Sequence, residues 1–485
     1  MKINTFTIVF VPGEKIYRQL YKHIKSGIDS GRYSSGDKLP STRHLATELG
    51  ISRTSVLNAY NELIATGYLI SQKGSGYEVN SVINTDIINT EKSKKIRLKY
   101  KKEKYTPFNT ESMDMSFFPA YKMAKIISKV GRKKPLSLIY TDQYDKFGSQ
   151  DLRNEICNYV YEKKGINCSL EQVIITSGSL ESFEMCINIL TEPGQTVSLE
   201  APCFSTHIYY LKNNGRNVRF LQVDREGACC NDISTGTKFV FITPECQYPF
   251  GMIMSNERKN DFIQWASDNC GWIIEDDFDS NSVVNNRHEP TIFSYDKNHR
   301  TLYFGNFSQV IERALNIGYI ILPKELISFF RKTEYVPKVS YLPQLIMAEF
   351  IKSGDFYRNL LKARKICSEK RHAFVNMLKK YLSVYGNTIE NNAGSVVVFI
   401  LNAKISDATI ASSARLKGVN IKILSSIFHD IPLNGFIFGF IHFNKDELKK
   451  SVIILRDICA LYCQQNCVDL TLYSPLKEYP NNDVK

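Results

Sequence analysis

The polar residues that open a predicted helix at position 53 have the types and spacing needed to bind phosphate. Ser52 precedes an apolar stripe of helical spacing that continues to about Thr66, so Ser52 is the predicted N-cap. Free backbone N–H groups and the helix dipole favour phosphate at such a helix start. Arg53, Thr54 and Ser55 follow the cap, and their small or basic side chains allow a close approach to a DNA groove.

Two flanking segments carry further groups of this kind. Arg43 stands near the start of the preceding predicted helix, which Ser41 caps, and it can reach a backbone phosphate. Lys73 stands in a glycine-containing hairpin turn and can lie over a minor groove or its phosphates. The predicted DNA-binding residues are therefore Ser41, Thr42, Arg43, Ser52, Arg53, Thr54, Ser55, Lys73, Gly74, Ser75 and Gly76.

These groups require a scaffold, and the first eighty residues predict one. Apolar residues recur at helical spacing from Ile16 to about Ser30, and Gly50 ends the second helix. Residues 68–71 and 77–79 are predicted strands of a hairpin. The third helix has a predicted buried stripe of Val56, Leu57, Tyr60, Leu63 and Ile64. This order of elements predicts a winged helix-turn-helix over residues 1–80.

The charge of the chain is concentrated near its start. The 485 residues carry a formal net charge of +13, of which +9 lies within the first 105 residues. Such a balance favours a polyanionic partner. Residues 81–110 lack a hydrophobic stripe and are predicted to form a basic linker. For the linker alone, the alternative interpretation is a solvated segment that only keeps the protein soluble.

The remaining residues, 111–485, alternate short β-branched runs with helical patterns. Examples of the runs are residues 173–175, 196–199, 239–242, 272–274 and 319–322. This alternation predicts an α/β fold with a mainly parallel sheet wrapped by helices.

Cysteine usage and hydropathy point to the cytoplasm. The twelve cysteines show no disulfide-framework spacing, and no apolar run is as long as a membrane span. Cys459, Cys463 and Cys467 are spaced to share one face of a predicted C-terminal helix. No histidine or CxxC pair accompanies them, so apolar packing is favoured over a metal or redox site, and no metal site is predicted.

Two stretches of the sequence resemble known families. The segment LPSTRHLATELGISRTSVLNAYNELIATGYLISQKGSGYEV resembles the GntR-type winged-helix domain. Downstream, the motifs TSGS at 176–179, TPECQYPFG at 243–251 and EDDFDS at 275–280 resemble landmarks of fold-type I aminotransferases. A GntR-type domain followed by an aminotransferase-like domain is the arrangement of the MocR subfamily of bacterial regulators. The resemblance implies a small C-terminal subdomain at about 345–475.

In that family, a lysine binds pyridoxal phosphate as a Schiff base, and the resemblance places Gln309 at its position. A glutamine amide is not nucleophilic, and no lysine lies between residues 301 and 323. The resemblance further implies that Asn316 replaces a phosphate-binding arginine and that Phe278 replaces a tyrosine. Asp276 corresponds to the partner of the pyridinium nitrogen, although we expect it to be satisfied by backbone N–H groups. The vestigial pocket comprises Ser177, Gly178, Ser179, Tyr248, Asp276, Phe278, Ser308, Gln309 and Asn316.

Two further departures concern anion binding. The resemblance leads us to expect amides after the serine–glycine turn, but Leu180 and Glu181 stand there, and a carboxylate would repel a phosphate. No arginine stands between Arg415 and Arg456, where a substrate carboxylate is usually held.

The sequence thus predicts a DNA-binding transcription regulator and not an enzyme. Its large domain is expected to form a homodimer, head-to-tail by resemblance, and to sense a small-molecule effector without a covalent cofactor. The expected partner is a double-stranded DNA operator, and the expected location is the cytoplasm, at the nucleoid. One alternative is a regulator that still binds pyridoxal phosphate non-covalently. An active aminotransferase is the least favoured alternative, because its chemistry needs the amine.

Overall fold

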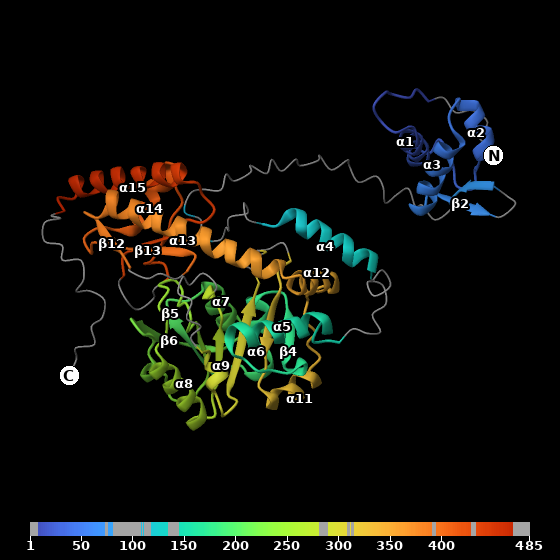
Figure 1. Cartoon of the computed structure of the whole chain (residues 1–485). Coiled ribbons are helices and arrows are strands. Elements are labelled where there is room, and N and C mark those ends of the chain that lie inside the picture. Colours follow the sequence, from blue (N-terminus) through green and yellow to red (C-terminus); the bar gives the residue numbers. More distant parts are fainter. Residues whose placement is uncertain are drawn as a thin grey trace, which may run out of the picture. The chain divides into compact units, whose positions relative to one another are not determined.

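Amphipathic helices and short apolar strands build two compact units, Met1–Lys102 and Glu103–Lys485, in a computed structural model of the chain (Figure 1). The structure describes residues 8–72, 76–80, 108, 110, 118–133, 145–280, 290–307, 311, 315–389, 394–427 and 433–468.

The N-terminal unit is a winged helix-turn-helix, as predicted. Its elements are α1 (Ile16–Asp29), β1 (Lys38–Leu39), α2 (Thr42–Leu49), α3 (Arg53–Ala65), β2 (Leu69–Gln72) and β3 (Gly76–Val79). The three strands form an antiparallel sheet of order β1-β3-β2, in which β1 was not predicted. Gly50 adopts a left-handed conformation (φ 64°) after α2, which explains why the second helix stops there.

The core of this unit confirms most of the predicted stripe on the third helix. Val56, Tyr60 and Leu63 are buried together with Leu20, Ile24 and Leu45 of the first two helices. The prediction for Leu57 was wrong, because its side chain is 40% exposed. Ala59 lies in the core instead, since the buried face of a helix returns at every third or fourth residue.

The second unit is built on an eight-stranded mixed sheet of order β4-β11-β10-β9-β8-β5-β6-β7. Only β11 and β7 run against their neighbours, so the other strands share one direction. The strands are β4 (Val173–Thr176), β5 (Thr196–Ala201), β6 (Asn217–Asp224), β7 (Gly227–Ala228), β8 (Thr237–Ile242), β9 (Trp272–Asp276), β10 (Thr301–Asn306) and β11 (Gly318–Ile321).

Helices cover both faces of this sheet. One face packs against α6 (Ser179–Leu190), α7 (Ser205–Asn213) and α11 (Lys324–Lys332). The other packs against α4 (Ala120–Lys133), α5 (Gln150–Lys164), α8 (Asn256–Asp268), α9 (Ile292–Tyr295) and α12 (Tyr341–Lys352). Residues of β4 alternate between the two cores, as the two-residue period of a strand requires.

A second, antiparallel sheet of order β12-β13-β15-β14 forms the C-terminal part of this unit. Its elements are α13 (Asp355–Leu382), β12 (Gly386–Thr388), β13 (Val396–Leu401), α14 (Asp407–Leu416), β14 (Lys422–Ile423), β15 (Gly435–Gly439) and α15 (Lys445–Gln465). Helix α13, orange in Figure 1, joins the two parts because Phe356 lies in the core of the large sheet and Phe374 in that of the small one. Phe108, which we placed in the linker, is also buried in the small core.

The predicted cysteine face on the last helix is only partly correct. Cys459 and Cys463 are buried in the small core, which agrees with apolar packing. Cys467 is exposed, because α15 ends at Gln465 and Cys467 has a positive φ of 49° beyond the helix. Among the described residues, no group of three or more metal-ligating side chains is found, and no helix is long and apolar enough to span a membrane.

Candidate DNA-reading helix and cofactor-like site

The start of α3 is capped and open to solvent. Ser52 is the N-cap, and its hydroxyl accepts a hydrogen bond of 3.1 Å from the backbone N–H of Ser55. The side chains of Ser52, Arg53 and Thr54 are exposed, whereas that of Ser55 is half-buried. The helix therefore presents its unpaired N–H groups and a guanidinium on one accessible end.

The neighbouring predicted contacts fall into two groups. Arg43 and Ser41 are exposed, and the Ser41 hydroxyl accepts a hydrogen bond from His44 N as the N-cap of α2. Thr42 is buried, and its hydroxyl accepts a 3.4 Å hydrogen bond from Nε of Arg53. Thr42 thus positions the Arg53 side chain. Gly76 is exposed at the start of β3, whereas Lys73, Gly74 and Ser75 lie outside the described residues.

In the large unit, sheet topology brings the predicted pocket residues to one edge. Strands β4, β5, β8 and β9 are parallel, so the residues that follow them meet at the same edge. Strand β11 runs the other way, and its first residue, Gly318, pairs with both Thr176 and Asn306. Ser177, Asp276 and Asn316 therefore share this edge, while Ser308 and Gln309 lie outside the described residues.

The turn after β4 has the form of an anion cradle, and a carboxylate of the chain fills it. Gly178 is the N-cap of α6 with φ 89°, followed by Ser179 as the first helical residue. Backbone N–H of Ser177 donates a 2.6 Å hydrogen bond to Oε2 of Glu181. The other oxygen, Oε1, accepts from Lys338 N at 2.8 Å and from the Tyr335 hydroxyl at 3.5 Å.

Asn316 closes the same turn from the start of β11. Its Nδ2 donates to the carbonyl oxygen of Ser177 at 3.2 Å and to the Ser177 hydroxyl at 3.1 Å. A Cβ at Gly178 would lie 3.0 Å from Oδ1 of Asn316, so this close approach favours glycine. A neutral amide thus occupies the position where the resemblance leads us to expect an arginine.

Asp276, at the end of β9, corrects our expectation of a satisfied carboxylate. It is 2% exposed, and its Oδ1 has no hydrogen-bond partner in the described part of the chain. Burial raises the pKa of Asp276 to about 8, and the charges of Asp277 and Glu200 add to the rise. Asp276 shares a sheet face with Ile274, whose core includes residues of α6 and α7.

Aromatic side chains gather beyond the same strand ends. The rings of Phe204 and Tyr248 stack with their centroids 4.2 Å apart, and Phe278 meets Phe204 edge-on at 4.9 Å. The Tyr248 hydroxyl accepts a 2.9 Å hydrogen bond from Nζ of Lys422. Phe204 and Lys422 were not predicted. Phe204 follows the predicted strand at 196–199, and this position beyond a strand end is a signal that could have identified it.

A buried ion cluster adjoins this edge and was also missed. Lys164, the last residue of α5, donates to Asp277 at 2.8 Å, to Glu245 at 3.0 Å and to the Ser280 hydroxyl at 2.7 Å. Burial would lower the pKa of Lys164, but the two carboxylates outweigh it, so the pKa is raised. Sequence spacing carries no signal for this cluster, because its members come from three separate segments.

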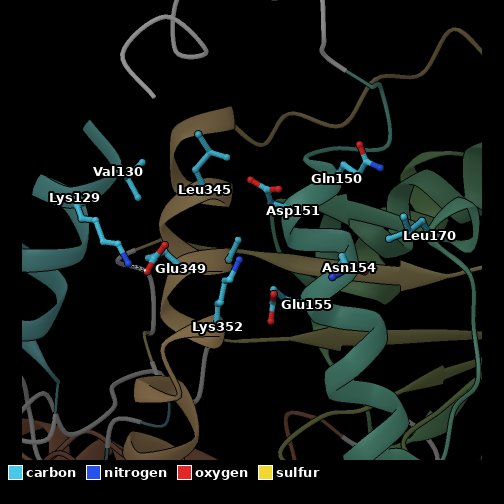
Figure 2. A pocket seen from close by; sticks show the side chains of 11 residues that line it. Lys129, Val130, Gln150, Asp151, Asn154, Glu155, Leu170, Leu345, Glu349 and Lys352 are labelled. Atoms are coloured by element: carbon cyan, nitrogen blue, oxygen red, sulfur yellow. Dashed lines mark hydrogen bonds and ion pairs between the residues drawn. The ribbon is translucent and has the colours of Figure 1, made fainter. Parts of the chain in front are cut away.

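A groove of about 440 Å³ lies between α4, α5 and α12, away from the residues of the cofactor-like site. Figure 2 shows the ion pair of Lys129 with Glu349 at one side of it. Acidic and basic side chains are mixed along the groove, and none of them belongs to the predicted pocket.

The family of the chain follows from comparison with known proteins. Residues 139–425, more than half of the chain, match the model of the family "Aminotransferase class I and II". The chain belongs to that family. Residues 16–79 match the model of "Bacterial regulatory proteins, gntR family". This aminotransferase-family chain thus carries a GntR-type helix-turn-helix at its N-terminal end, the arrangement of MocR-type regulators.

The aminotransferase-family chain is similar to named regulators over nearly its whole length. It is 28% identical to the "Probable rhizopine catabolism regulatory protein MocR" of Rhizobium meliloti, with 91% of this chain and 93% of the relative covered. It is 25% identical to the pyridoxine biosynthesis regulator PdxR of Corynebacterium glutamicum, covering 91% and 96%. Among solved structures, the kynurenine aminotransferase of Pyrococcus horikoshii, in complex with PMP, gives a TM-score of 0.67 at 18% identity, covering 78% and 98%.

Pyridoxal phosphate is the cofactor that this family implies, and the described residues do not fit it as a whole. The unpartnered Oδ1 of Asp276 suits a protonated ring nitrogen. The cradle does not suit a phosphate, because Glu181 already accepts the Ser177 N–H and no arginine stands at position 316. Position 309 offers no amine for a Schiff base.

Proposed function

We propose that this protein is a DNA-binding transcription regulator that has no Schiff-base chemistry. Its winged helix-turn-helix reads an operator, and its aminotransferase-like domain serves dimerisation and senses an effector non-covalently. The exposed, capped start of α3 with Arg53 is the observation that carries the DNA-binding role. The net charge of +9 in the first 105 residues supports it, since DNA is a polyanion.

Replacing Arg53 tests the DNA-reading role. Arg53→Ala is expected to weaken operator binding and to lower the log–log salt slope by about 0.9, as for one lost phosphate contact. The operator is first located by footprinting the bound DNA across the genome, and affinities are then measured by fluorescence anisotropy at several salt concentrations. Arg32→Ala is the control, because Arg32 is an exposed arginine outside α2 and α3. Unchanged affinity in Arg53→Ala would place the reading surface elsewhere.

The absence of enzyme activity rests on Gln309. Purified protein mixed with pyridoxal phosphate is expected to show no aldimine absorbance band that borohydride removes, because no amine stands at position 309. Gln309→Lys is the matched variant, in which the missing amine is restored. A borohydride-sensitive band at a defined site in the unaltered protein would contradict the proposal.

One alternative function is supported by a specific observation. The unpaired, buried oxygen of Asp276 favours a regulator that still binds pyridoxal phosphate without a covalent bond. Equilibrium dialysis distinguishes this alternative from the proposed function. Tight retention of pyridoxal phosphate, but not of pyridoxal without the phosphate, supports the alternative alone.

The assembly and location are further parts of the proposal. A single reading helix per chain usually serves one half-site, so we expect a homodimer, with the head-to-tail arrangement implied by the family. The molar mass from light scattering checks this directly. Because the proposed role is binding to an operator in DNA, we expect the protein in the cytoplasm, at the nucleoid.

A further inference from the structure

We propose that Glu181 is a built-in anion that takes the place of a ligand's phosphate, so that the cofactor-like site admits only ligands without a phosphate. The inference rests on the proposed function, because it names the chemical class of effector that the aminotransferase-like domain can sense.

The carboxylate of Glu181 lies where an anion is favoured. Helix α6 has twelve residues, and its N-terminus carries the positive end of the helix dipole. Three donors converge on the two oxygens, namely Ser177 N–H, Lys338 N–H and the Tyr335 hydroxyl. The donors come from two segments of the chain that lie more than 150 positions apart in the sequence. The Glu181 side chain is buried, with only 6% exposed. This is the donor set of an anion site with its anion in place.

An ordinary helix cap explains less of this arrangement. In a capping box, a glutamate at the third helical position bonds the N–H of the N-cap residue, which here is Gly178. Glu181 instead bonds the N–H of Ser177, one residue earlier, and extends to the segment 335–338. The donors that bind it are neutral, and its contacts among the described residues include no cation, so a second anion in the turn would meet the charge of Glu181.

Asp276 stands at the same sheet edge, at the C-terminal end of β9. Asp276 is buried, and its Oδ1 has no hydrogen-bond partner among the described residues. A buried polar atom of this kind is usually paired in a native protein. A ligand of this site therefore carries a polar group that hydrogen-bonds to Asp276 and no phosphate, and Phe204, Tyr248 and Phe278 supply aromatic surface nearby.

Anion rescue tests the role of Glu181. Glu181→Ser is expected to lower the Tm of the large unit by about 2–4 °C. Inorganic phosphate is expected to restore most of that loss, because it can occupy the vacated place, whereas sodium chloride of equal ionic strength does not. Wild type and Glu184→Ser, in which a half-buried glutamate one turn along α6 is changed, correct for general stabilisation by phosphate. Equal gains in all three proteins would overturn the proposal.

Ligand binding provides a second measurement that does not depend on a stability change. Pyridoxamine and its 5′-phosphate share a ring and lack an aldehyde, and calorimetry compares their affinities. Wild type is expected to bind the phosphate ester no more tightly than it binds pyridoxamine. Glu181→Ser is expected to bind the phosphate ester at least about tenfold more tightly than it binds pyridoxamine. Glu181→Gln, of nearly the same size, replaces the serine variant if that one does not fold. A tenfold preference of wild type for the ester would overturn the inference.

Different results would overturn the proposed function and the inference about Glu181. Operator binding does not involve Glu181, so a failed anion rescue with intact operator binding overturns only the inference about the ligand. Loss of specific operator binding in the wild-type protein would overturn the proposed function itself.

Discussion

Lys164→Met is expected to lower the free energy of unfolding of the large unit by about 3–5 kcal/mol, the usual effect of removing one partner from a buried ion pair. Lys164 and Asp277 are both about 95% buried, with 5% of each side chain exposed, and Glu245 is 14% exposed. All three ammonium donors are used, by Asp277, Glu245 and Ser280. Without the lysine, two buried carboxylates would face each other unpaired.

Denaturant unfolding monitored by tryptophan fluorescence measures this effect. Lys163→Met is the control, because Lys163 precedes Lys164, is only half-buried and makes no ion pair among those described. The double variant Lys164→Met/Asp277→Asn is expected to recover part of the loss, since it removes one of the two uncompensated charges. A change below about 0.5 kcal/mol in Lys164→Met, the size of an ordinary surface substitution, would show that the cluster adds no stability.

The second large effect concerns pH. Three buried carboxyls stand at the strand ends, and burial raises the pKa of Glu200 to about 7, of Glu275 to about 7 and of Asp276 to about 8. Each of these groups keeps its proton in the folded state at a pH where the unfolded chain has lost it. The stability of the large unit is therefore expected to fall as pH rises from about 4 to about 8.

The size of this loss of stability follows from how far the three pKa values are raised. One pKa unit corresponds to about 1.4 kcal/mol, and each of the three pKa values is raised by more than two units, so the loss of stability between about pH 4 and about pH 8 amounts to several kcal/mol. Asp276→Asn is expected to flatten this dependence most, since its amide is neutral at every pH. Asp268→Asn, at an exposed position, is the control. Equal slopes of Tm against pH in Asp276→Asn and wild type would contradict the assignment.

The N-terminal unit could be predicted closely because its signals are local. A serine cap, a left-handed glycine and an apolar stripe each act within a few residues, and Ser41, Gly50 and Ser52 are found in the predicted roles. The error at Leu57 arose where the stripe borders solvent, and spacing alone does not say how wide the buried face is. The short strand β1 was missed because two residues carry no period.

The cofactor-like site could be predicted only in outline. The motifs located the turn at Ser177–Gly178 and the strand end at Asp276, and topology brings them to one edge. The contacts made there join distant segments. Asn316 bonds Ser177 across 139 positions, and Lys164 bonds Asp277 across 113. No periodicity or local motif specifies such pairs, because they depend on how helices and strands pack.

The sequence by itself determined the helix-turn-helix, the α/β class of the large unit and the lack of a lysine at position 309, since each depends on residue type or short-range spacing. Only the tertiary structure decided what replaces the lost chemistry. In the sequence, Glu181 is a carboxylate that would repel a phosphate; in the fold it is an acceptor for donors from two segments. A buried charge is defined by the groups that surround it, and only folding assembles them.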